Sequence, residues 1–443
     1  MSYHFCRLGA VTAVFLIFFS GILPAQPAES PKADVLPRAE VWKNLRLEKA
    51  RSSSPREKSG LEKGLLYLES RRLDEIFSIR YKDFYPKFGT PSPGSGIGAG
   101  LRFFKSKTGG APLALESSFL NSTRNYRLLD LQFGRFDRIA PEFFVGPPDF
   151  GAPFEFGEPG PRQVDRSRYF LYADLRYRYF PQEDFFGLGN DSLPDRRTSY
   201  LEESYSVEAV AGYQVTPWLA AAFRMGPRGY NIEPGTDKRF PTVQDLFDDS
   251  AAPGLAGQPN FLFYSAGIFV NLTDRPGNPH KGGVLGVSLG RFDDVDTNSY
   301  NFLQWSVDAR GYLPLGSPQR VLAVRAYTSN ASADSGSRVP FYLQATLGGN
   351  STLRGFEEFR FRGHNLVYLS SEYRWEPAPA LELALFYDTG KVYPDGVDLT
   401  FDHFKSSIGA GIRVKTTRRT IVRFDVGRSS EGTRVQLRFG PSF

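Results

Sequence analysis

Most of the chain alternates between apolar and polar residues with a period of two. In 169–179 the odd-numbered positions are Tyr, Leu or Ala, whereas Asp174, Arg176 and Arg178 occupy even-numbered positions. Because successive side chains of a β-strand point to opposite faces, this pattern predicts a strand with one apolar and one charged face. The same alternation recurs along the chain, for example in 204–213, 303–310 and 434–439. It therefore predicts one large β-sheet between Ile79 and Phe443.

The length of these runs separates a membrane barrel from a soluble sheet. Each run spans about ten residues, the length that a tilted strand needs to cross a bilayer core. Several apolar faces begin or end in Tyr, Trp or Phe, as interfacial girdles require. Strands of soluble β-sandwiches also alternate, but they usually have about 5–6 residues. The sequence thus predicts an all-β fold, a transmembrane antiparallel β-barrel with apolar residues toward lipid and polar residues toward the lumen.

The connectors fall into two length classes that alternate along most of the chain. The short ones are 215–217, 315–318, 376–379 and 415–418, and the long ones are 181–199, 226–259, 330–363 and 393–405. Short periplasmic turns and longer external loops are typical of such barrels, and the count is about 16 strands. Residues 137–167 are the exception, because a long connector occurs where the strand count requires a short turn. Either a strand before it is misplaced, or an irregular segment faces the periplasm.

The N-terminus has the features of a cleaved signal peptide. Arg7 precedes an apolar run from Ala10 to Leu23, and small residues follow as far as Ala28. This predicts a signal peptide over 1–28, because the run is short for a membrane span of about 20 residues. A retained anchor is the alternative. Residues 29–78 are polar and basic with one amphipathic stretch, which predicts a periplasmic tether or short helix before a barrel domain at 79–443; a partner-docking helix is the other interpretation.

Composition gives little support to catalysis or nucleic-acid binding. The net charge of +6 is small for 443 residues and is spread along the chain. The single cysteine, Cys6, lies in the predicted signal, which excludes disulfides and thiolate metal sites from the exported chain. The four histidines show no zinc-binding spacing, and only His364 is a candidate for a rim hydrolase. Gly94–Gly100 lacks the Lys-Ser/Thr of a phosphate loop and is better interpreted as glycine-rich strand. No enzyme activity, cofactor or metal is expected.

A glycine-rich segment, 347–363, lies between two alternating segments. Arg354 within it carries five donors in a rigid fork that matches a carboxylate. In the two following strands the alternation places Glu372 and Asp388 on the lumen face. If the loop folds into the barrel, Arg354 bridges both acids through charge-assisted hydrogen bonds. If it does not, the two acids line a wet lumen among other charges.

These segments resemble a known family. Leu347-Gly-Gly-Asn-Ser-Thr-Leu-Arg-Gly-Phe356 is similar to the sixth-loop signature of the BamA/TamA superfamily of outer-membrane barrels, also called the bacterial surface antigen family. Phe386-Tyr-Asp-Thr-Gly390 resembles the Phe-x-Asp-x-Gly strand of that family. Segments 273–282 and 184–190 resemble a periplasmic turn and a segment of short members. The C-terminus is similar to the β-signal read by the assembly machinery, through Leu437, Phe439, Gly440 and Phe443.

The resemblance implies a site, a location and partners. The loop tip would tuck into the lumen, with a loop lock made of Arg354, Gly355, Phe356, Glu372, Asp388 and Gly390. The protein would lie in the bacterial outer membrane, contact its lipid and be inserted there by the assembly machinery. It would help proteins or lipid to insert, or client polypeptides to cross, through a weak seam between the first and last strands, without binding nucleic acid.

One departure limits this implication. Members that insert or export proteins carry periplasmic POTRA repeats, which bind client strands by β-augmentation. The short stretch before the first predicted strand implies a stand-alone barrel, a short member without such repeats. Two other functions remain open: a passive channel or structural outer-membrane protein whose loop plugs the lumen, and a soluble secreted β enzyme.

Overall fold

A computed structural model describes residues 48, 82–92, 94–105, 113–135, 168–275, 278–378, 380–394, 402–415 and 420–439. The chain divides into two units, 1–59 and 60–443, and every strand lies in the second. The predicted signal peptide and the tether at 29–78 lie outside the described residues, apart from Glu48. Within the described ranges, no helix has the length and apolar character that spanning a bilayer would need.

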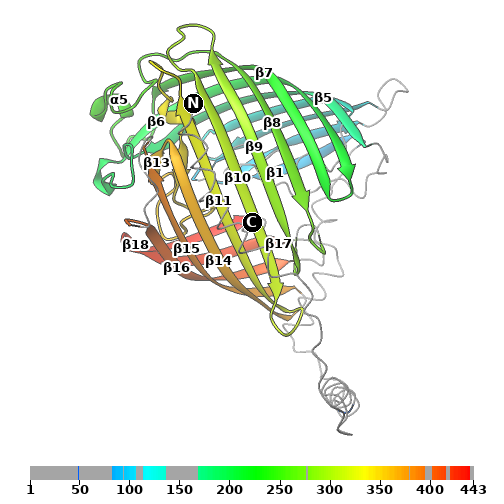
Figure 1. The fold of residues 1–443 in the computed structure, drawn as a ribbon. Coiled ribbons are helices and arrows are strands. Elements are labelled where there is room, and N and C mark those ends of the chain that lie inside the picture. Colours follow the sequence, from blue (N-terminus) through cyan, green and yellow to red (C-terminus); the bar gives the residue numbers. More distant parts are fainter. Residues whose placement is uncertain are drawn as a thin grey trace, which may run out of the picture. The chain divides into compact units, whose positions relative to one another are not determined.

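Sixteen strands of the second unit form one antiparallel sheet in chain order, with neighbouring strands side by side (Figure 1). They are β1 (Phe84–Gly89), β2 (Gly98–Lys105), β3 (Ala114–Ser122), β4 (Arg127–Arg135), β5 (Tyr169–Phe185), β6 (Thr198–Thr216), β7 (Leu219–Pro234), β8 (Phe261–Asn271), β9 (Gly282–Asp294), β10 (Phe302–Pro314), β11 (Arg320–Ala333), β14 (Asn365–Ala378), β15 (Leu381–Tyr393), β16 (Lys405–Lys415), β17 (Thr420–Ser429) and β18 (Gly432–Phe439). The predicted count of about 16 strands is confirmed.

The remaining elements are short. Strands β12 (Ala345–Leu347) and β13 (Phe361–Gly363) pair with each other as a separate two-stranded ribbon. One four-residue helix, α5 (Val243–Leu246), and two 3-10 turns, η4 (Pro194–Arg196) and η5 (Phe341–Leu343), lie in the connectors. The described chain is therefore almost entirely sheet and loop.

The two faces of the sheet differ as the alternation predicts. On β5, Tyr169 and Leu171 are 52% and 58% exposed, whereas Asp174 of the same strand is 4% exposed. Val435 and Leu437 are likewise exposed on β18. Because these exposed side chains are apolar and charged side chains such as Asp174 are buried, the outward face suits lipid and the inward face suits a polar lumen. The predicted all-β barrel class is confirmed.

Several strands extend further than the sequence predicted. Pro181 and Gly226 were expected to begin long loops, but they lie inside β5 and β7, which have 17 and 16 residues. Proline has no N–H to donate to a ladder, and within sheets it is confined to edges, strand starts and bulges. At Pro227 the ladder with β6 is interrupted and then resumes at Arg228, and near Pro181 a register shift absorbs the irregularity. Gly94 and Gly96, expected within a strand, instead lie in the β1–β2 turn with φ of 80° and 79°.

The two ends of the strands carry different connectors. Turns at 217–218, 315–319 and 379–380 are short, and we call this the turn end; loops at 186–197, 235–260 and 334–364 leave the opposite, loop end. Arg135 of β4 pairs with Leu171 of β5 at the turn end, so the connector between these strands begins and ends there. No strand before that connector is misplaced. The connector itself, 136–167, lies outside the described residues.

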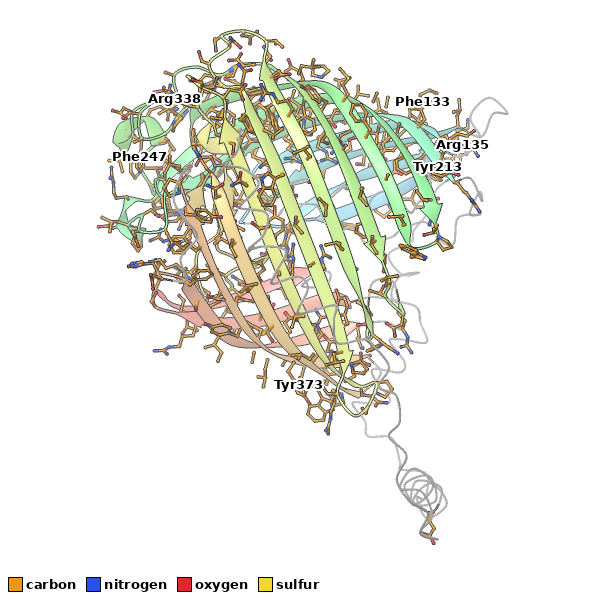
Figure 2. All side chains as sticks on the ribbon, in the orientation of Figure 1. Phe133, Arg135, Tyr213, Phe247, Arg338 and Tyr373 are labelled. Carbon is orange, nitrogen blue, oxygen red and sulfur yellow. The ribbon has the colours of Figure 1, made fainter. Side chains whose placement is uncertain are left out.

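An aromatic cluster joins the loops at the loop end. Phe341 packs against Phe185 and Tyr200 with ring centroids 4.8 and 5.2 Å apart, and Phe185 contacts Phe247 at 4.9 Å. Arg338 forms an ion pair with Asp249 between two of these loops. Figure 2 shows Phe247 and Arg338 at this end, with Arg135 and Tyr213 at the turn end. The loops thus pack on one another across the strand ends.

The sheet has two edges that lack a partner in the described chain. Strand β1 pairs with β2, β18 pairs with β17, and no pairing joins β1 to β18 among the described residues. The strands at these edges are short, with 6 residues in β1 and 8 in β18, against 19 in β6. We call this pair of edges, one on β1 and one on β18, the seam.

Candidate functional site

The segment 347–363 folds back against the inner wall of the barrel. Gly348 and Gly349 take φ values of 119° and 78°, which L side chains rarely adopt, and the Gly348 N–H donates to Thr352 Oγ1 at 2.9 Å. Four of its apolar side chains are buried against residues of β11, β14 and β15: Leu347, Leu353, Phe356 and Phe361 pack with Tyr327, Leu366, Tyr368 and Val392. This apolar contact holds the loop in place and brings Arg354 to the wall.

Arg354 meets both acids that the sequence singled out. Its Nε and Nη2 groups donate to Asp388 Oδ2 and Oδ1, each at 2.7 Å, and its Nη1 donates to Glu372 Oε1 at 2.5 Å. Arg354 is 2% exposed and both carboxylates are 0% exposed. The two acids therefore do not simply line a wet lumen. Both are buried around the same guanidinium, which binds Asp388 through two hydrogen bonds and Glu372 through one.

Strand pairing places the two acids for this contact. Ser370 of β14 lies opposite Asp388 of β15, and Glu372 lies opposite Phe386. The Ser370 hydroxyl donates to Asp388 Oδ1 at 2.8 Å, and the Tyr368 hydroxyl approaches the same oxygen at 3.3 Å. Two neutral donors thus satisfy lone pairs of Asp388 that Arg354 does not reach, as a buried carboxylate requires.

An aromatic ring forms the floor of the site. The Arg354 guanidinium carbon lies 3.5 Å from the centroid of the Phe386 ring. A Cβ at Gly409 of β16 would lie 2.3 Å from Phe386 Cζ, so the ring also lies close to that glycine. The contact between the guanidinium and the ring is a cation–π interaction. The sequence motif contained Phe386, but the alternation alone assigned it no role.

Glu372 is shared by three arginines rather than one. Besides Arg354 it contacts Arg374 Nε at 2.9 Å and Arg413 Nη2 at 2.8 Å, and Arg413 also pairs with Glu382 at 2.8 Å. The sequence analysis did not identify Arg374, Arg413 and Glu382 as site residues. The alternation of inward and outward positions could have indicated two of them, since Arg374 shares the face of Glu372 and the pattern within 405–415 turns Arg413 inward.

The network continues to the turn end of the barrel. Lys415 contacts both Glu376 and Glu382, and His280 Nε2 lies 2.7 Å from Glu376 Oε1. His280 belongs to the 273–282 connector, where Asp274 Oδ1 accepts the backbone N–H groups of His280 and Lys281. This connector lies at the turn end, where the resemblance had placed it, and it contacts the end of β14.

The other predicted lock residues serve close packing. A Cβ at Gly355 would lie 2.8 Å from both Arg428 C and Ser407 Cβ, and a Cβ at Gly390 would lie 2.9 Å from Leu347 Cδ1. Phe356 is buried against Phe361, with centroids 5.2 Å apart. The two glycines are thus needed because neighbouring atoms leave no room for a side chain.

The predicted β-signal is only partly visible. Leu437 is exposed on the lipid-facing side of β18, and Phe439 is the last residue of that strand. Gly440 and Phe443 lie outside the described residues.

The 184–190 segment packs on the base of the loop. Gly189 N donates to Arg362 O at 2.7 Å, and the Asn190 side chain donates to His403 O at 2.6 Å. Among the described residues, no group of three or more His, Cys, Asp or Glu side chains could hold a metal ion. The ion pairs of Arg354 with Glu372, Asp388 and, at 3.9 Å, Asp425 join the loop to strands β14, β15 and β17.

Comparison with known proteins agrees with this geometry. The Omp85 superfamily domain matches residues 143–443, more than half of the chain. No protein of curated function matches the sequence. Among solved structures, BamA from Haemophilus ducreyi lacking POTRA domains 1–3 is similar with a TM-score of 0.56 and 16% identity, over 82% of this chain and 70% of that one.

CdiB from Escherichia coli is also similar, with a TM-score of 0.48 and 14% identity, over 82% of this chain and 63% of that chain. The present chain thus spans less than two thirds of that protein. At 16% identity the likeness to BamA supports a similar fold and nothing further. The match of the family domain supports membership of the superfamily. This chain belongs to the Omp85 superfamily of outer-membrane β-barrels.

Proposed function

We propose that this protein is a non-enzymatic outer-membrane barrel that helps proteins or lipid to insert into the membrane, or polypeptides to cross it, at the seam between β1 and β18. The observation that carries the proposal is the pair of edges without a partner in the described chain, in a member of this superfamily. Its partners are then bilayer lipid, the assembly machinery during its own insertion, and client polypeptides.

The energetics of strand edges favour this role. An edge strand presents a row of backbone N–H and C=O groups, onto which another strand can add. Inside a bilayer each unsatisfied backbone group costs several kcal/mol, because no water is present to replace the missing partner. A strand edge without a backbone partner is therefore a favourable place for an incoming amphipathic strand. A fully closed barrel wall offers no such edge.

Strand length adds a second argument. With a rise of about 3.3 Å per residue and a tilt of about 45°, the 6 residues of β1 reach about 14 Å across the membrane, whereas the 13 residues of β10 reach about 30 Å. The hydrocarbon core of a bilayer is about 30 Å thick. Short strands beside the seam favour local thinning of the bilayer, which reduces the apolar barrier that a client strand must cross.

Photo-crosslinking in outer membranes tests the proposal. A photoreactive residue at Val435 on β18 or at Phe84 on β1 should capture newly made outer-membrane proteins, because both side chains are exposed at the seam strands. The matched control is Leu303, an exposed residue near the loop end of β10, a strand that is paired on both edges. Equal capture at Leu303 and at the seam positions would overturn the proposal.

A passive channel is the competing function, and the packing in the lumen weighs against it. The loop 347–363 lies inside the barrel, and the aromatic cluster joins the loops at the loop end. A lumenal cavity of about 220 Å³ is lined by charged groups that pair with one another, such as Arg228 and Glu208 at 2.6 Å. Planar bilayers should therefore give no large, steady pores; steady conductance that is independent of any client would favour the channel instead.

A further inference from the structure

The inward-folded loop touches more than the acids of the lock. Past Arg354 it reaches the last hairpin of the chain, β17–β18. Glu357 Oε1 forms an ion pair with Arg434 Nη2 of β18 at 2.5 Å. Arg360 Nη2 forms a second ion pair with Glu431 Oε1 in the hairpin turn at 2.9 Å. Two ion pairs of opposite polarity, one acidic and one basic on the loop side, thus join the loop to the hairpin that borders the seam.

Both loop residues are anchored on their other side. Glu357 Oε2 accepts from Arg197 Nη1 at 3.1 Å, and Arg197 is itself held by Asp184 through two hydrogen bonds of 2.8 and 3.0 Å. Arg360 donates to Ser192 Oγ and Ser192 O, at 2.8 and 2.6 Å. The loop therefore connects the 186–197 loop, between β5 and β6, to the β17–β18 hairpin.

Other polar contacts bring the same hairpin toward the loop. Arg438 of β18 contacts the side chains of Asn350 and Ser351, and Arg423 of β17 donates to Asn350 O at 2.5 Å. The Ser429 hydroxyl donates to Gly355 O at 2.8 Å. The inward face of the hairpin is thus bound to the loop along its length, from the turn at Glu431 to Arg438.

These contacts matter because β18 has one paired edge in the described chain. Its backbone pairs with β17, and the seam lies on its other side. A strand held along one edge can swing away unless its side chains restrain it. Its outward side chains, Val435 and Leu437, face lipid and offer no directional restraint, so the restraint must come from the inward arginines.

We propose that Glu357, Arg360, Glu431 and Arg434 form a latch through which the inward-folded loop positions the β17–β18 hairpin, so that β18 moves at the seam only when these two ion pairs separate. This proposal rests on the proposed function, since it assigns positioning residues to the seam. It differs from the Arg354 lock: Arg354 pairs with Glu372 of β14 and Asp388 of β15 and lies 3.9 Å from Asp425 of β17, whereas the latch joins the loop to β18 and to the hairpin turn.

Distance measurement between two spin labels tests the latch directly and needs no client. Labels at Phe84→Cys and Val435→Cys, introduced in the full chain, report on the separation of β1 and β18 in lipid nanodiscs. The purified exported barrel then carries no other thiol if the predicted signal containing Cys6 is removed; Cys6→Ser covers the other case. Arg434→Gln and Glu431→Gln each remove one ion pair, Arg434→Lys keeps the charge, and Arg320→Gln on β11 is the control.

We expect each Gln variant to raise the population with a long label distance about three- to fivefold, the scale of a partly exposed ion pair. The double variant should raise it about tenfold, Arg434→Lys should largely restore the original distribution, and Arg320→Gln should leave it unchanged. Folding of each variant is checked by its heat-dependent gel mobility. Unchanged distributions in both single variants and the double variant would overturn the latch.

The outcome also separates the latch from the proposed function. If the distances respond as expected but no variant alters the capture of clients at the seam, the latch stands and the proposed function fails. If seam capture of clients is observed but the distances do not respond to the latch variants, the latch fails and the proposed function stands.

Discussion

Replacing Arg354 by alanine should release the loop without preventing strand formation. The substitution removes three charge-assisted hydrogen bonds and leaves Glu372 and Asp388, both without solvent exposure, to find other partners. Glu372 keeps Arg374 and Arg413. Asp388 keeps only neutral donors, because among the described residues Arg354 is the one cation that pairs with it. The main cost is therefore an uncompensated charge at Asp388.

Breaking a buried ion pair by removing one partner costs about 3–5 kcal/mol, and we expect Arg354→Ala to lie in that range. A loss of 3 kcal/mol shifts the equilibrium between docked and undocked loop by more than about a hundredfold. Arg354→Lys keeps a positive charge but cannot make the bidentate contact with Asp388 or the same planar contact with Phe386. We expect a smaller loss, about 1.5–3 kcal/mol, the scale of one hydrogen bond to a charged group.

Heat-dependent gel mobility and urea titration in lipid vesicles measure the relative stability of the unchanged protein and the two Arg354 variants. The transition should occur most easily for Arg354→Ala, then for Arg354→Lys, and with most difficulty for the unchanged protein. The control is Arg320→Gln, at an exposed position that begins β11. Protease cleavage within 350–360 should be fastest for Arg354→Ala, slower for Arg354→Lys and slowest for the unchanged protein, because an undocked loop is accessible to the protease. Equal transitions and equal cleavage for all four proteins would refute the assignment of Arg354 as the residue that holds the loop.

Three further results follow from the same contacts. Glu372→Gln should destabilise the loop more than Asp388→Asn in urea titration, because three buried arginines share Glu372; the reverse order would contradict that sharing. Gly355→Ala should cost about 1–3 kcal/mol in the same titration, since its Cβ would overlap Arg428 and Ser407; a wild-type midpoint would show that the loop relaxes freely. In hydrogen exchange, β1 and β18 should exchange faster than β10, and equal protection would contradict a seam.

Alternation and local motifs were enough to predict the fold class and the centre of the lock. The period-two pattern fixes which side chains of a strand point inward, so Glu372 and Asp388 could be placed in the lumen from their parity alone. Their approach to Arg354 depended on the resemblance, because spacing left open whether the loop folds inward. The count of strands also followed from local pattern, since each strand alternates independently of its neighbours.

Features that depend on the register between distant strands could not be predicted in the same way. The pairing of Glu357 with Arg434 joins residues 77 positions apart, and many inward arginines have the same parity as Arg434. The prediction of strand ends failed for a related reason. Pro227 cannot donate a hydrogen bond to a ladder, yet β7 continues through this residue. The reason is that the neighbouring strand β8 pairs with β7 here, with Leu262 opposite Pro227. Such continuation depends on the partner strand, and no local signal carries it.

The lock and the latch together explain why a costly buried network lies in this lumen. Buried ion pairs lose much of their attraction to desolvation, so bulk stability is a weak reason for their presence. What they supply is a single geometry: β14 and β15 are joined to the loop through Glu372 and Asp388, Arg413 of β16 is joined to Glu372, and the loop presents Glu357 and Arg360 to the terminal hairpin. The wall from β14 to β16 then acts as a rigid support. The ion pairs that join β18 and the hairpin turn to the loop are more exposed than those of Arg354 with Glu372 and Asp388, so the first part of the barrel to move should be β18.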